Sequence, residues 1–279
     1  MKNEGPVQLS DLYAVALEAA LAARDIINSA AEQPKQIDYK GATDLVTATD
    51  RESEAVITGI IRRQFPDHQI LAEESGRTNH KSDYVWLIDP LDGTTNFVHG
   101  YPSYAVSIGI AYQENLVCGV IVELPVNHVY HAIRGLGAFC DNQPISVSNV
   151  SELGKSLLVT GFGYVHDAAW QANMELFKHF TDLTQGVRRL GAAAVDFAHL
   201  ASGKVDGFWE FNLHPWDTAA GVLLVEEAGG NITRMDGEKY SVYDKQMLAS
   251  NGCLHSDLLK NIAAIQTESS TRVFGVNPD

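Results

Sequence analysis

Cysteine and positive charge are both scarce in this chain of 279 residues. Only three cysteines occur, and no two of them have the CxxC spacing, which argues against a zinc ribbon and against a secreted disulfide framework. Lys and Arg number 20 against 35 Asp and Glu, which gives a formal net charge of −15. So acidic a chain lacks the basic surface that neutralises phosphates, so we expect no nucleic-acid partner.

Long hydrophobic runs are also missing. The longest apolar run, Tyr104 to Tyr112, is far shorter than the roughly 20 residues that a membrane helix needs. Near the N-terminus, Glu4, Gln8 and Asp11 occupy positions where a secretory signal would be apolar. We therefore expect a cytoplasmic protein with no membrane partner. Because 45% of the residues are hydrophobic, the chain can bury a large core.

Hydrophobic periodicity divides the chain into helices and strands without a repeat or a linker. Apolar steps of three and four residues predict helices from 12 to about 34, from Asp50 as N-cap to the proline at 66, and over 168–183, 192–201, 216–227 and 256–265. Short apolar runs predict strands at 69–72, 84–88, 207–211, 232–235 and 247–249, and a β-meander over 103–147. Since both halves mix strands with helices, the sequence predicts a layered α/β or α+β enzyme fold.

Two stretches, 82–133 and 205–233, contain acidic residues but no Lys or Arg. In the first, Asp89 and Asp92 follow the apolar run 84–88, where a buried strand emerges. Two carboxylates this close raise each other's pKa unless a cation joins them. With no basic residue nearby in the sequence, a divalent metal ion is the simplest cation, and oxygen ligands favour Mg²⁺ or Mn²⁺ over zinc.

The residues that follow Asp89 add groups that can hold an anion. Pro90 fixes a bend after the strand, and Gly93 lets the backbone approach a ligand closely. Thr94 and Thr95 then open a helix or turn whose free N–H groups can bind phosphate. Carboxylates for a metal beside donors for an anion are what phosphoryl transfer requires.

Structural interpretations compete with each of these. Asp92 before glycine is a common turn, Asp50 is a plausible N-cap, and Asp217 after Trp216 could stabilise the start of a helix. The sharper alternative is a phosphatase with an aspartyl nucleophile, whose loop places its two aspartates two residues apart. Asp89 and Asp92 are three apart, a spacing that puts them on different faces of an extended strand.

The sequence resembles the inositol monophosphatase family of metal-dependent, lithium-sensitive phosphatases. Residues 86–99 look like its first signature, and residues 216–221, continuing to 230, are similar to its second. Similarity extends to 44–50, 71–76 and 190–194, so it covers nearly the whole chain. The resemblance implies a layered α-β-α-β-α sandwich of the inositol monophosphatase or fructose-1,6-bisphosphatase type, formed by one domain over residues 1–279 and usually assembled as a homodimer.

Carried over position by position, the resemblance implies two or three Mg²⁺ ions, for which Mn²⁺ can substitute. Glu73, Asp89 and the Leu91 carbonyl would bind the first ion. Asp89, Asp92 and Asp217 would bind the second, and Glu73 would partly hold a third.

The same resemblance implies catalytic roles for Glu73, Thr94 and Asp50, the last two orienting the attacking water. Gly93 and Thr94 would hold the phosphate. Substrate contacts are expected from Leu91, Asp92, Gly93, Thr94, Gly191, Ala192, Ala193, Glu210 and Asp217. His99 and His214 flank the motifs and receive no role, and Lys40 matches a basic residue that bacterial relatives place near the metal loop.

We therefore expect a Mg²⁺-dependent phosphomonoesterase that uses metal-activated water on a small polyol phosphate, inositol 1-phosphate above all. Glu210 favours a neutral polyol, because a carboxylate accepts hydrogen bonds from hydroxyls but repels a second phosphate. Arg188 and Arg189 could offset that repulsion. Fructose 1,6-bisphosphate, histidinol phosphate and nucleotide phosphates stay open as substrates. So does an added protein-binding role, since some bacterial relatives bind transcription machinery.

Overall fold

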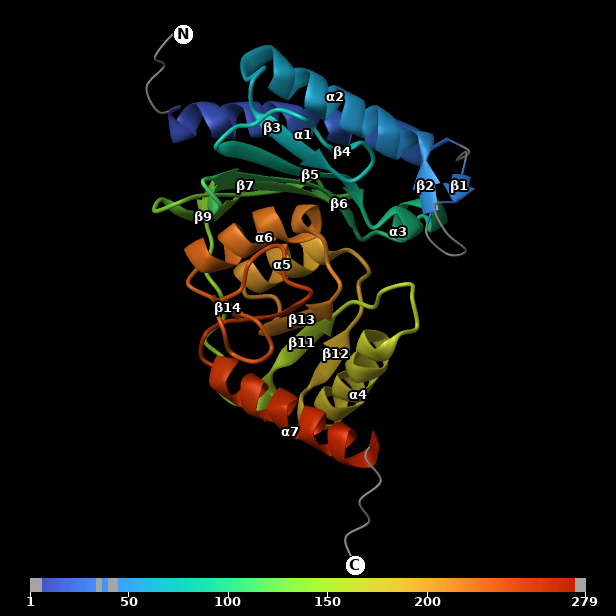
Figure 1. The fold of residues 1–279 in the computed structure, drawn as a ribbon, viewed down its shortest axis with the longest axis vertical. Helices are drawn as coiled ribbons and strands as arrows, with labels where there is room; N and C mark the ends of the chain where they lie inside the picture. The colour runs from blue at the N-terminus through green and yellow to red at the C-terminus, as the bar shows by residue number, and fades with distance from the viewer. Residues whose placement is uncertain (1–6, 34–36, 40–44, 274–279) are drawn as a thin grey trace, which may run out of the picture.

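The computed structural model describes residues 7–33, 37–39 and 45–273. Its helices and sheets alternate in five layers, as Figure 1 shows. From one side to the other these are α1 (Leu9–Ala31) with α2 (Ala48–Gln64), an eight-stranded sheet, α5 (Ala193–Ala201) with α6 (Pro215–Glu227), a five-stranded sheet, and α4 (Ala168–Leu183) with α7 (His255–Val273). The predicted α-β-α-β-α sandwich is confirmed.

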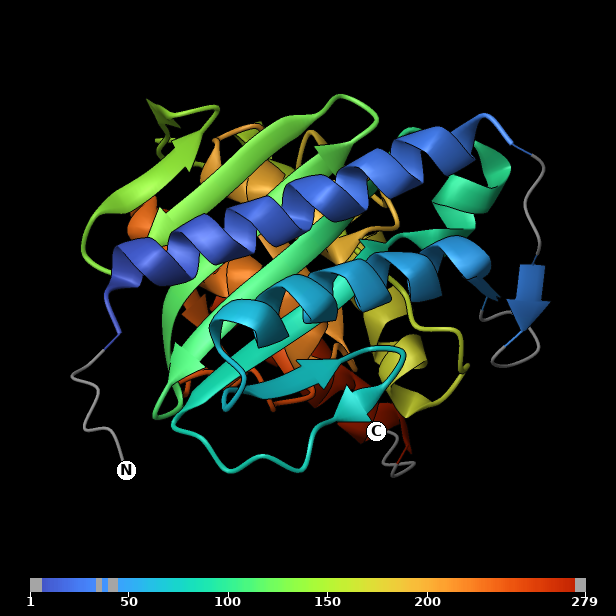
Figure 2. The same ribbon diagram turned by 90° about the horizontal axis from the view of Figure 1, so that it is seen from above.

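The large sheet contains the predicted meander. Its strand order is β10-β9-β8-β7-β6-β5-β3-β4, antiparallel except for the parallel pair of β3 and β5. The strands are β3 (Gln69–Ala72), β4 (Gly76–Arg77), β5 (Tyr84–Asp92), β6 (Tyr104–Tyr112), β7 (Asn115–Leu124), β8 (His128–Ile133), β9 (Gly137–Cys140) and β10 (Gln143–Pro144). Viewed from above in Figure 2, α1 and α2 lie side by side across this sheet.

The small sheet has the order β12-β11-β13-β15-β14. Its strands are β11 (Leu157–Thr160), β12 (Gly186–Arg188), β13 (Gly207–Phe211), β14 (Asn231–Thr233) and β15 (Gln246–Ser250). A two-stranded ribbon of β1 (Ile37–Tyr39) and β2 (Leu45–Thr47), the short helix α3 (Thr94–His99) and a 3₁₀ turn at Leu153–Lys155 complete the described elements. None of the helices in the described ranges combines the length and hydrophobicity needed to span a membrane.

Helix α1 forms and packs as its sequence predicts. Leu12, Ala16, Ala19, Ala23 and Ile27 follow one another at three- and four-residue steps, and all are fully buried. They share a hydrophobic core with α2 and with the face of the large sheet that α1 and α2 cover. This packing makes the large sheet a rigid platform, buried on both faces, from which the site residues project.

Helix α2 begins earlier than predicted, because its N-cap lies three residues before Asp50. Thr47 is the N-cap, and its hydroxyl accepts the Thr49 N–H at 3.1 Å. Asp50 is therefore not the N-cap but the third helical residue, whose carboxylate accepts the Thr47 N–H at 2.8 Å in a capping box. The reciprocal arrangement fixes the Asp50 side chain at the end of the large sheet.

Strand β5 continues through Pro90 instead of ending at 88. Asp89 is paired with Ser107 and Asp92 with Ala105, so three steps along β5 match two along β6 in a β-bulge. Cross-strand partners share a face, and residues two apart on β6 also share one. Asp89 and Asp92 therefore lie on the same face, so the expectation that their spacing separates them is wrong. The spacing no longer argues against an aspartyl nucleophile.

Helix α6 lies unusually close to the large sheet. A Cβ added to Gly109 of β6 would lie 2.5 Å from the Ala219 side chain, and one added to Gly119 of β7 would lie 2.9 Å from the Ala220 carbonyl oxygen. Only glycine on the strands and small residues on the helix allow this approach. It sets the distance between α6, which carries Asp217, and the end of β5.

Candidate active site

The carboxyl ends of β3 and β5 meet the amino-terminal ends of α2, α3, α5 and α6. Because β3 and β5 run parallel, Glu73 after β3 and Asp89 in β5 leave the sheet at the same edge, and the Glu73 N–H donates to the Ile88 carbonyl at 3.1 Å. Helix α3 starts directly after Asp92, and Asp217 lies in the first turn of α6. Residues far apart in the sequence are thus gathered in one place.

Asp89 is the most enclosed of these carboxylates, with 3% of its surface exposed. Its Oδ1 accepts the Leu91 N–H at 3.1 Å. Burial raises the pKa of Asp89 well above its usual value, and the charges of Glu73, Asp92 and Asp217 raise it further. A group in these surroundings is either protonated or accompanied by a cation.

Asp92 is linked to the start of α5. Its Oδ2 accepts the Ala194 N–H at 2.6 Å, which holds the preceding loop with Gly191, Ala192 and Ala193 beside it. Burial raises the pKa of Asp92 to about 7, although hydrogen bonds from backbone N–H groups, that of Ala194 first, lower it. The structure therefore brings the predicted metal ligands and the predicted substrate loop together.

The same loop is tied to α3 by Asn96. Its Nδ2 donates to the Leu190 carbonyl at 2.7 Å and to the Ser103 carbonyl at 2.6 Å. Gly93 precedes α3 with φ +81°, and a Cβ there would lie 2.9 Å from the Ser103 oxygen and 3.1 Å from the Ala192 side chain. Glycine at 93 is thus required by backbone conformation and packing alike.

Thr94 and Asp50 form a pair between α3 and α2. The Thr94 hydroxyl lies 2.9 Å from Asp50 Oδ1 and 3.1 Å from the Leu91 carbonyl oxygen. The other Asp50 oxygen accepts hydrogen bonds from the Thr47 N–H at 2.8 Å and from its hydroxyl at 2.6 Å. Asp50 is 1% exposed, so its carboxylate is firmly held as an acceptor for the Thr94 proton.

Asp217 serves the helix and the site together. Its Oδ2 accepts the His214 N–H at 2.7 Å in a capping box that starts α6. Burial raises the pKa of Asp217 well above its usual value, the Asp92 and Glu73 charges add to this, and Lys245 opposes it. The structural interpretation of Asp217 is therefore correct, and it does not compete with a role at the site, because the helix uses one of the two oxygens.

Glu210 lies at the end of β13, on the small-sheet side of the site. It is 8% exposed, and its carboxylate receives no hydrogen bond from the described residues. Burial raises the pKa of Glu210 to about 8, with Asp217 and Asp92 adding to the shift and Arg189 opposing it. A Cβ at Gly161 would overlap the Glu210 carboxylate, so the end of β11 is shaped around this side chain.

Neighbouring polar contacts fix the backbone on both sides of Glu210. Asn173 of α4 donates from Nδ2 to the Gly161 carbonyl at 2.5 Å and accepts the Trp209 indole N–H at 2.6 Å. The Thr160 hydroxyl donates to the Trp209 carbonyl at 2.7 Å. These bonds hold the ends of β11 and β13 together, so the Glu210 carboxylate is positioned before any substrate binds.

Sequence reasoning missed two acidic residues here. Asp196 in α5 is 1% exposed, and neither of its oxygens has a hydrogen-bond partner in the described structure. Burial raises the pKa of Asp196 well above its usual value, and the Glu210 and Asp92 charges add to this. An aspartate inside the apolar run 192–198 was the available signal.

The second missed residue is Glu54 of α2, which is 5% exposed. Its two oxygens accept the N–H groups of Glu74 at 2.8 Å and Ser75 at 2.9 Å, so it anchors the turn that carries Glu73. Its position one helical turn after Asp50 places both acids on one face of α2. That spacing was visible in the sequence.

The donor set fits a hard divalent cation. The described residues form no Lys or Arg ion pair with Asp89, Asp92 or Asp217, and all the side-chain donors are oxygens. Among the described residues, Arg189 opposes the rise in the pKa of Glu210 and Lys245 opposes that of Asp217, without an ion pair to either carboxylate. Uncompensated buried carboxylates with raised pKa values are what a bound cation would stabilise.

The carboxylates do not form one tight cage. In the described ranges, the only His, Cys, Asp or Glu group with three ligand atoms within 4.8 Å of one another lies elsewhere, at His128, Cys140 and Asp141. Carboxylates that lie farther apart than this fit a site with two ions that share ligands, because two-metal sites hold their ions about 3.5–4 Å apart. Mg²⁺ also keeps several of its waters, so it needs fewer protein ligands.

Three residues flank the sequence motifs: Lys40, His99 and His214. Lys40 lies outside the described residues. His99 is exposed at the end of α3. His214 is the N-cap of α6, and its ring stacks on Trp216 with 4.7 Å between the ring centroids.

Known proteins match this chain in sequence and in fold. The model of the inositol monophosphatase family matches residues 8–271. The phosphatase IMPL1 of Arabidopsis thaliana, described as chloroplastic, is 51% identical over 94% of this chain and 72% of its own length. A putative Nus factor SuhB of Neisseria meningitidis is 41% identical over 81% of this chain and 87% of its own length.

A solved structure shows the same fold. The inositol monophosphatase from Anabaena is 44% identical to this chain, with a TM-score of 0.83 over 92% of this chain and 97% of its own. The resemblance found in the two sequence motifs is therefore confirmed, and the chain belongs to the inositol monophosphatase family, a family of metal-dependent phosphatases.

Proposed function

We propose that this chain hydrolyses a small phosphorylated polyol, inositol 1-phosphate above all, as a Mg²⁺-dependent phosphomonoesterase. The observation that carries the proposal is the convergence of Glu73, Asp89, Asp92 and Asp217 beside the Thr94–Asp50 pair. Family membership and the phosphatase names of its relatives support the same reaction. The reaction splits the bond between phosphorus and the alkoxide oxygen with water.

Two or three Mg²⁺ ions would be held as the resemblance implies. Glu73, Asp89 and the Leu91 carbonyl would bind one, and Asp89, Asp92 and Asp217 another, with Mn²⁺ able to substitute. When bound, such ions supply positive charge to the phosphate and to the departing oxygen and make water more acidic. The excess of carboxylate acceptors over protein donors supports this assignment.

The protein's own groups would orient the water and the phosphate. Because the Thr94 hydroxyl can donate to Asp50 at 2.9 Å, its oxygen lone pairs are free to accept a proton from a water molecule. Asp50, held by Thr47, then serves as the end of that proton path. The first N–H groups of α3, at Gly93 and Thr94, are suited to phosphate oxygens because they precede the helix's own hydrogen bonds.

Glu210 would bind the hydroxyl groups of the polyol. Gly191, Ala192 and Ala193 would form the adjoining wall of the site. Its carboxylate receives no hydrogen bond from the part of the chain that the structure describes, so it can accept hydroxyl hydrogen bonds without giving up an existing one. Arg189 lies close enough to influence the pKa of Glu210, which keeps fructose 1,6-bisphosphate open as a substrate. Histidinol phosphate and nucleotide phosphates also stay open, because the predicted metal ligands do not depend on the alcohol.

A panel of phosphomonoesters tests the proposal directly. Purified protein should release phosphate from inositol 1-phosphate with Mg²⁺, lose this activity with a chelator and regain it with added Mg²⁺ or Mn²⁺. Millimolar Li⁺ should lower the turnover, because a monovalent ion among Asp89, Asp92 and Asp217 stabilises less charge. Activity that survives chelation would contradict the metal assignment, and no hydrolysis of any member of the panel would contradict the function.

Stereochemistry separates direct attack by water from an aspartyl nucleophile. A substrate made chiral at phosphorus with oxygen isotopes and sulfur should give inverted product, because one in-line displacement inverts configuration. An aspartyl-phosphate route needs two displacements and gives retention. Retention, or a phosphorylated Asp89 peptide trapped by acid quench, would overturn the water mechanism.

A protein-binding role is the second candidate, supported by the relative named as a putative Nus factor. We also propose a homodimer and a cytoplasmic location, although one relative is named as chloroplastic. Light scattering of the purified protein tests the dimer, and fractionation of source cells tests the location. Capture of transcription proteins by the wild-type chain and by an inactive Asp92→Asn variant alike would separate binding from catalysis.

A further inference from the structure

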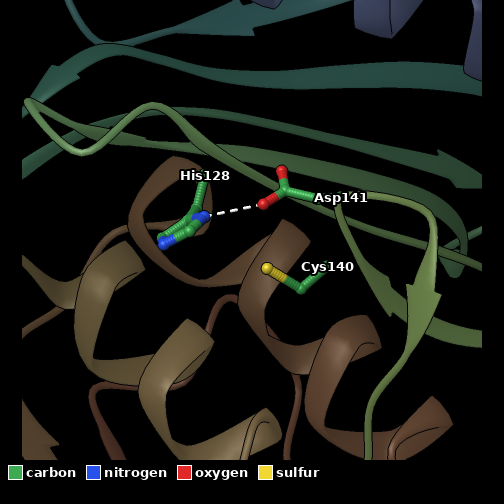
Figure 3. A group of neighbouring side chains, drawn as sticks. All are labelled: His128, Cys140 and Asp141. Carbon is green, nitrogen blue, oxygen red and sulfur yellow. Dashed lines mark hydrogen bonds and ion pairs between the residues drawn. The ribbon is translucent and has the colours of Figure 1, made fainter.

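A group of three unlike side chains lies on β8 and β9 of the large sheet, near its edge strand β10. His128 starts β8, Cys140 ends β9, and Asp141 opens the turn that follows (Figure 3). One potential ligand atom from each lies within 4.8 Å of the other two. The pairing of Tyr130 with Cys140 explains the meeting, because His128 is two residues from Tyr130 and therefore on the same face as Cys140.

The hairpin fixes Asp141 in place. Its Oδ1 accepts the Val129 N–H at 2.9 Å, and its Oδ2 lies 2.7 Å from His128 Nδ1. The backbone at Asp141 is left-handed, with φ +49°, as the tight turn requires. His128 and Asp141 are about half exposed, so ions in solution can reach them, while Cys140 is partly buried beside them.

We propose that His128, Cys140 and Asp141 bind a zinc-class divalent ion, at a site separate from the carboxylates of the active site. An imidazole nitrogen, a thiolate and a carboxylate are the ligands that Zn²⁺ takes in tetrahedral sites, and water would complete the fourth position. Two negative ligands would neutralise the ion. The hard oxygen donors of the active site, by contrast, suit Mg²⁺, so one chain would carry two different cation chemistries.

The distances allow binding with small movements. Zinc ligands sit about 2.0–2.3 Å from the metal, which places them roughly 3.3–3.8 Å from one another. His128 Nδ1 and Asp141 Oδ2, now 2.7 Å apart, would separate slightly to admit the ion, and the thiol would move toward it. The exposed His128 ring can make this adjustment by rotation about its side-chain bonds.

Lys204, whose positive charge acts on Cys140, already has partners. Lys204 Nζ donates to the Tyr130 hydroxyl at 2.9 Å and lies 3.9 Å from Glu123 Oε2. The Lys204 charge is therefore largely balanced by Glu123, and the cation would face Asp141 and Cys140 rather than a free ammonium group. His199 also pairs with Glu123, at 2.9 Å, and does not compete for the ion.

Cobalt is the appropriate probe, because thiolate bound to Co²⁺ absorbs in the near ultraviolet and oxygen ligands do not. The full-length protein is stripped with a chelator, saturated with Mg²⁺ and titrated with Co²⁺. We expect a sulfur-to-cobalt band that saturates at one ion per chain, accompanied by the visible bands of tetrahedral Co²⁺. Zn²⁺ should abolish both signals by displacing the cobalt.

Matched variants assign the signal to this site. Cys140→Ser should remove the sulfur band, whereas Cys253→Ser, at an exposed cysteine in another part of the fold, should retain it. His128→Ala and Asp141→Asn should weaken Co²⁺ binding by about tenfold or more, because losing even an outer-shell partner of a metal ligand costs about 10–100-fold. Asparagine tolerates the left-handed backbone at 141, so this variant keeps the turn.

Circular dichroism confirms that each variant is folded, and Cys140→Ala replaces Cys140→Ser if serine prevents folding. Absence of any sulfur band in the wild-type protein would overturn the proposal and leave His128 and Asp141 as a surface hydrogen-bonded pair. A band that persists in both Cys140 variants, or one that Cys253→Ser removes, would overturn it equally.

Discussion

Helix α5 has a carboxylate near each of its ends, the partly buried Asp92 and the buried Glu123, and their surroundings shift the two pKa values in opposite directions. At the amino-terminal end, Asp92 accepts the Ala194 N–H, and burial raises its pKa to about 7. At the other end, Glu123 accepts from His199 of α5 at 2.9 Å and from the Tyr130 hydroxyl at 3.0 Å. Burial alone would raise the pKa of Glu123, but these contacts and the Lys204 charge lower it instead.

The difference lies in where the compensating charge comes from. Glu123 has its cation and its donors within the chain, so it holds α5 against the large sheet without any ligand. Asp92 and its acidic neighbours Asp89 and Asp217 have backbone donors but no basic partner in contact within the described structure. A buried acid with internal partners can stay charged as part of the structure, whereas one without them is either protonated or accompanied by a cation.

The largest expected effect comes from removing charge at the uncompensated end. Asp92→Asn should lower phosphate release with Mg²⁺ by at least about 100-fold, because a metal ligand is weakened at nearly constant shape. Its fold should persist, since an amide oxygen can still accept the Ala194 N–H. Phosphate release and circular dichroism are measured on the same preparation, and full activity in this variant would contradict the assignment.

The matched change at the compensated end should affect stability and spare catalysis. Glu123→Gln should lower the free energy of unfolding by about 2 kcal/mol, because hydrogen bonds to charged groups contribute roughly 1.5–3 kcal/mol. Its kcat should stay within about twofold of wild type, because the polar partners of Glu123 in the described structure are Tyr130, His199 and Lys204, none of them a site residue. Urea unfolding measures the change in stability. A large loss of kcat with unchanged stability would contradict the structural role assigned to Glu123.

A smaller effect is expected on substrate choice. Glu210→Gln should lower kcat/KM for inositol 1-phosphate by about tenfold more than for an aryl phosphate, because only the polyol offers hydroxyls that can hydrogen-bond to the Glu210 carboxyl group. Both substrates are assayed with the same protein and metal concentrations. Equal losses on the two would show that Glu210 does not read the alcohol.

The smallest effect concerns pH in the absence of metal. Burial raises the pKa of Asp92 to about 7 and that of Glu210 to about 8, so the stability they contribute is present in acid and is lost as pH rises through these values. The chelated protein should lose unfolding free energy between pH 6 and pH 9, because the folded protein still holds protons on these groups at pH 6 and the unfolded chain does not. Mg²⁺ should restore most of it, and Asp92→Asn should flatten the dependence. A chelated protein that gains stability toward pH 9 would contradict the sign.

The helices and most strands could be predicted because their signals are local. The alanine-rich stripe of α1 and the meander over 103–147 contain their own periodicity. Strands β11 and β12 were missed, since each is only three or four residues long and depends on parallel pairing with distant segments. The observed ends of β14, β15 and α7 also differ from their predicted ends by one to eight residues.

At the site, it was easier to predict which residues take part than to predict the directions in which their side chains point. The acidic motifs identified Asp89, Asp92 and Asp217, and the structure brings all three together. The β-bulge that puts Asp89 and Asp92 on one face has no local signature, because it arises from the register with β6. Asp196 escaped notice for a related reason, since only the folded neighbourhood shows that it has no partner.

The contact of α6 with Gly109 and Gly119 works as a spacer of fixed thickness. Replacing either glycine with alanine would force the helix away from the sheet by the width of a methyl group, and Asp217 would move with it. The kinetics of such a variant would resemble those of an Asp217 variant, although the added methyl group lies on the buried face of a strand. The position of Asp217 relative to β5 therefore depends on two glycines, Gly109 and Gly119, that have no side chain.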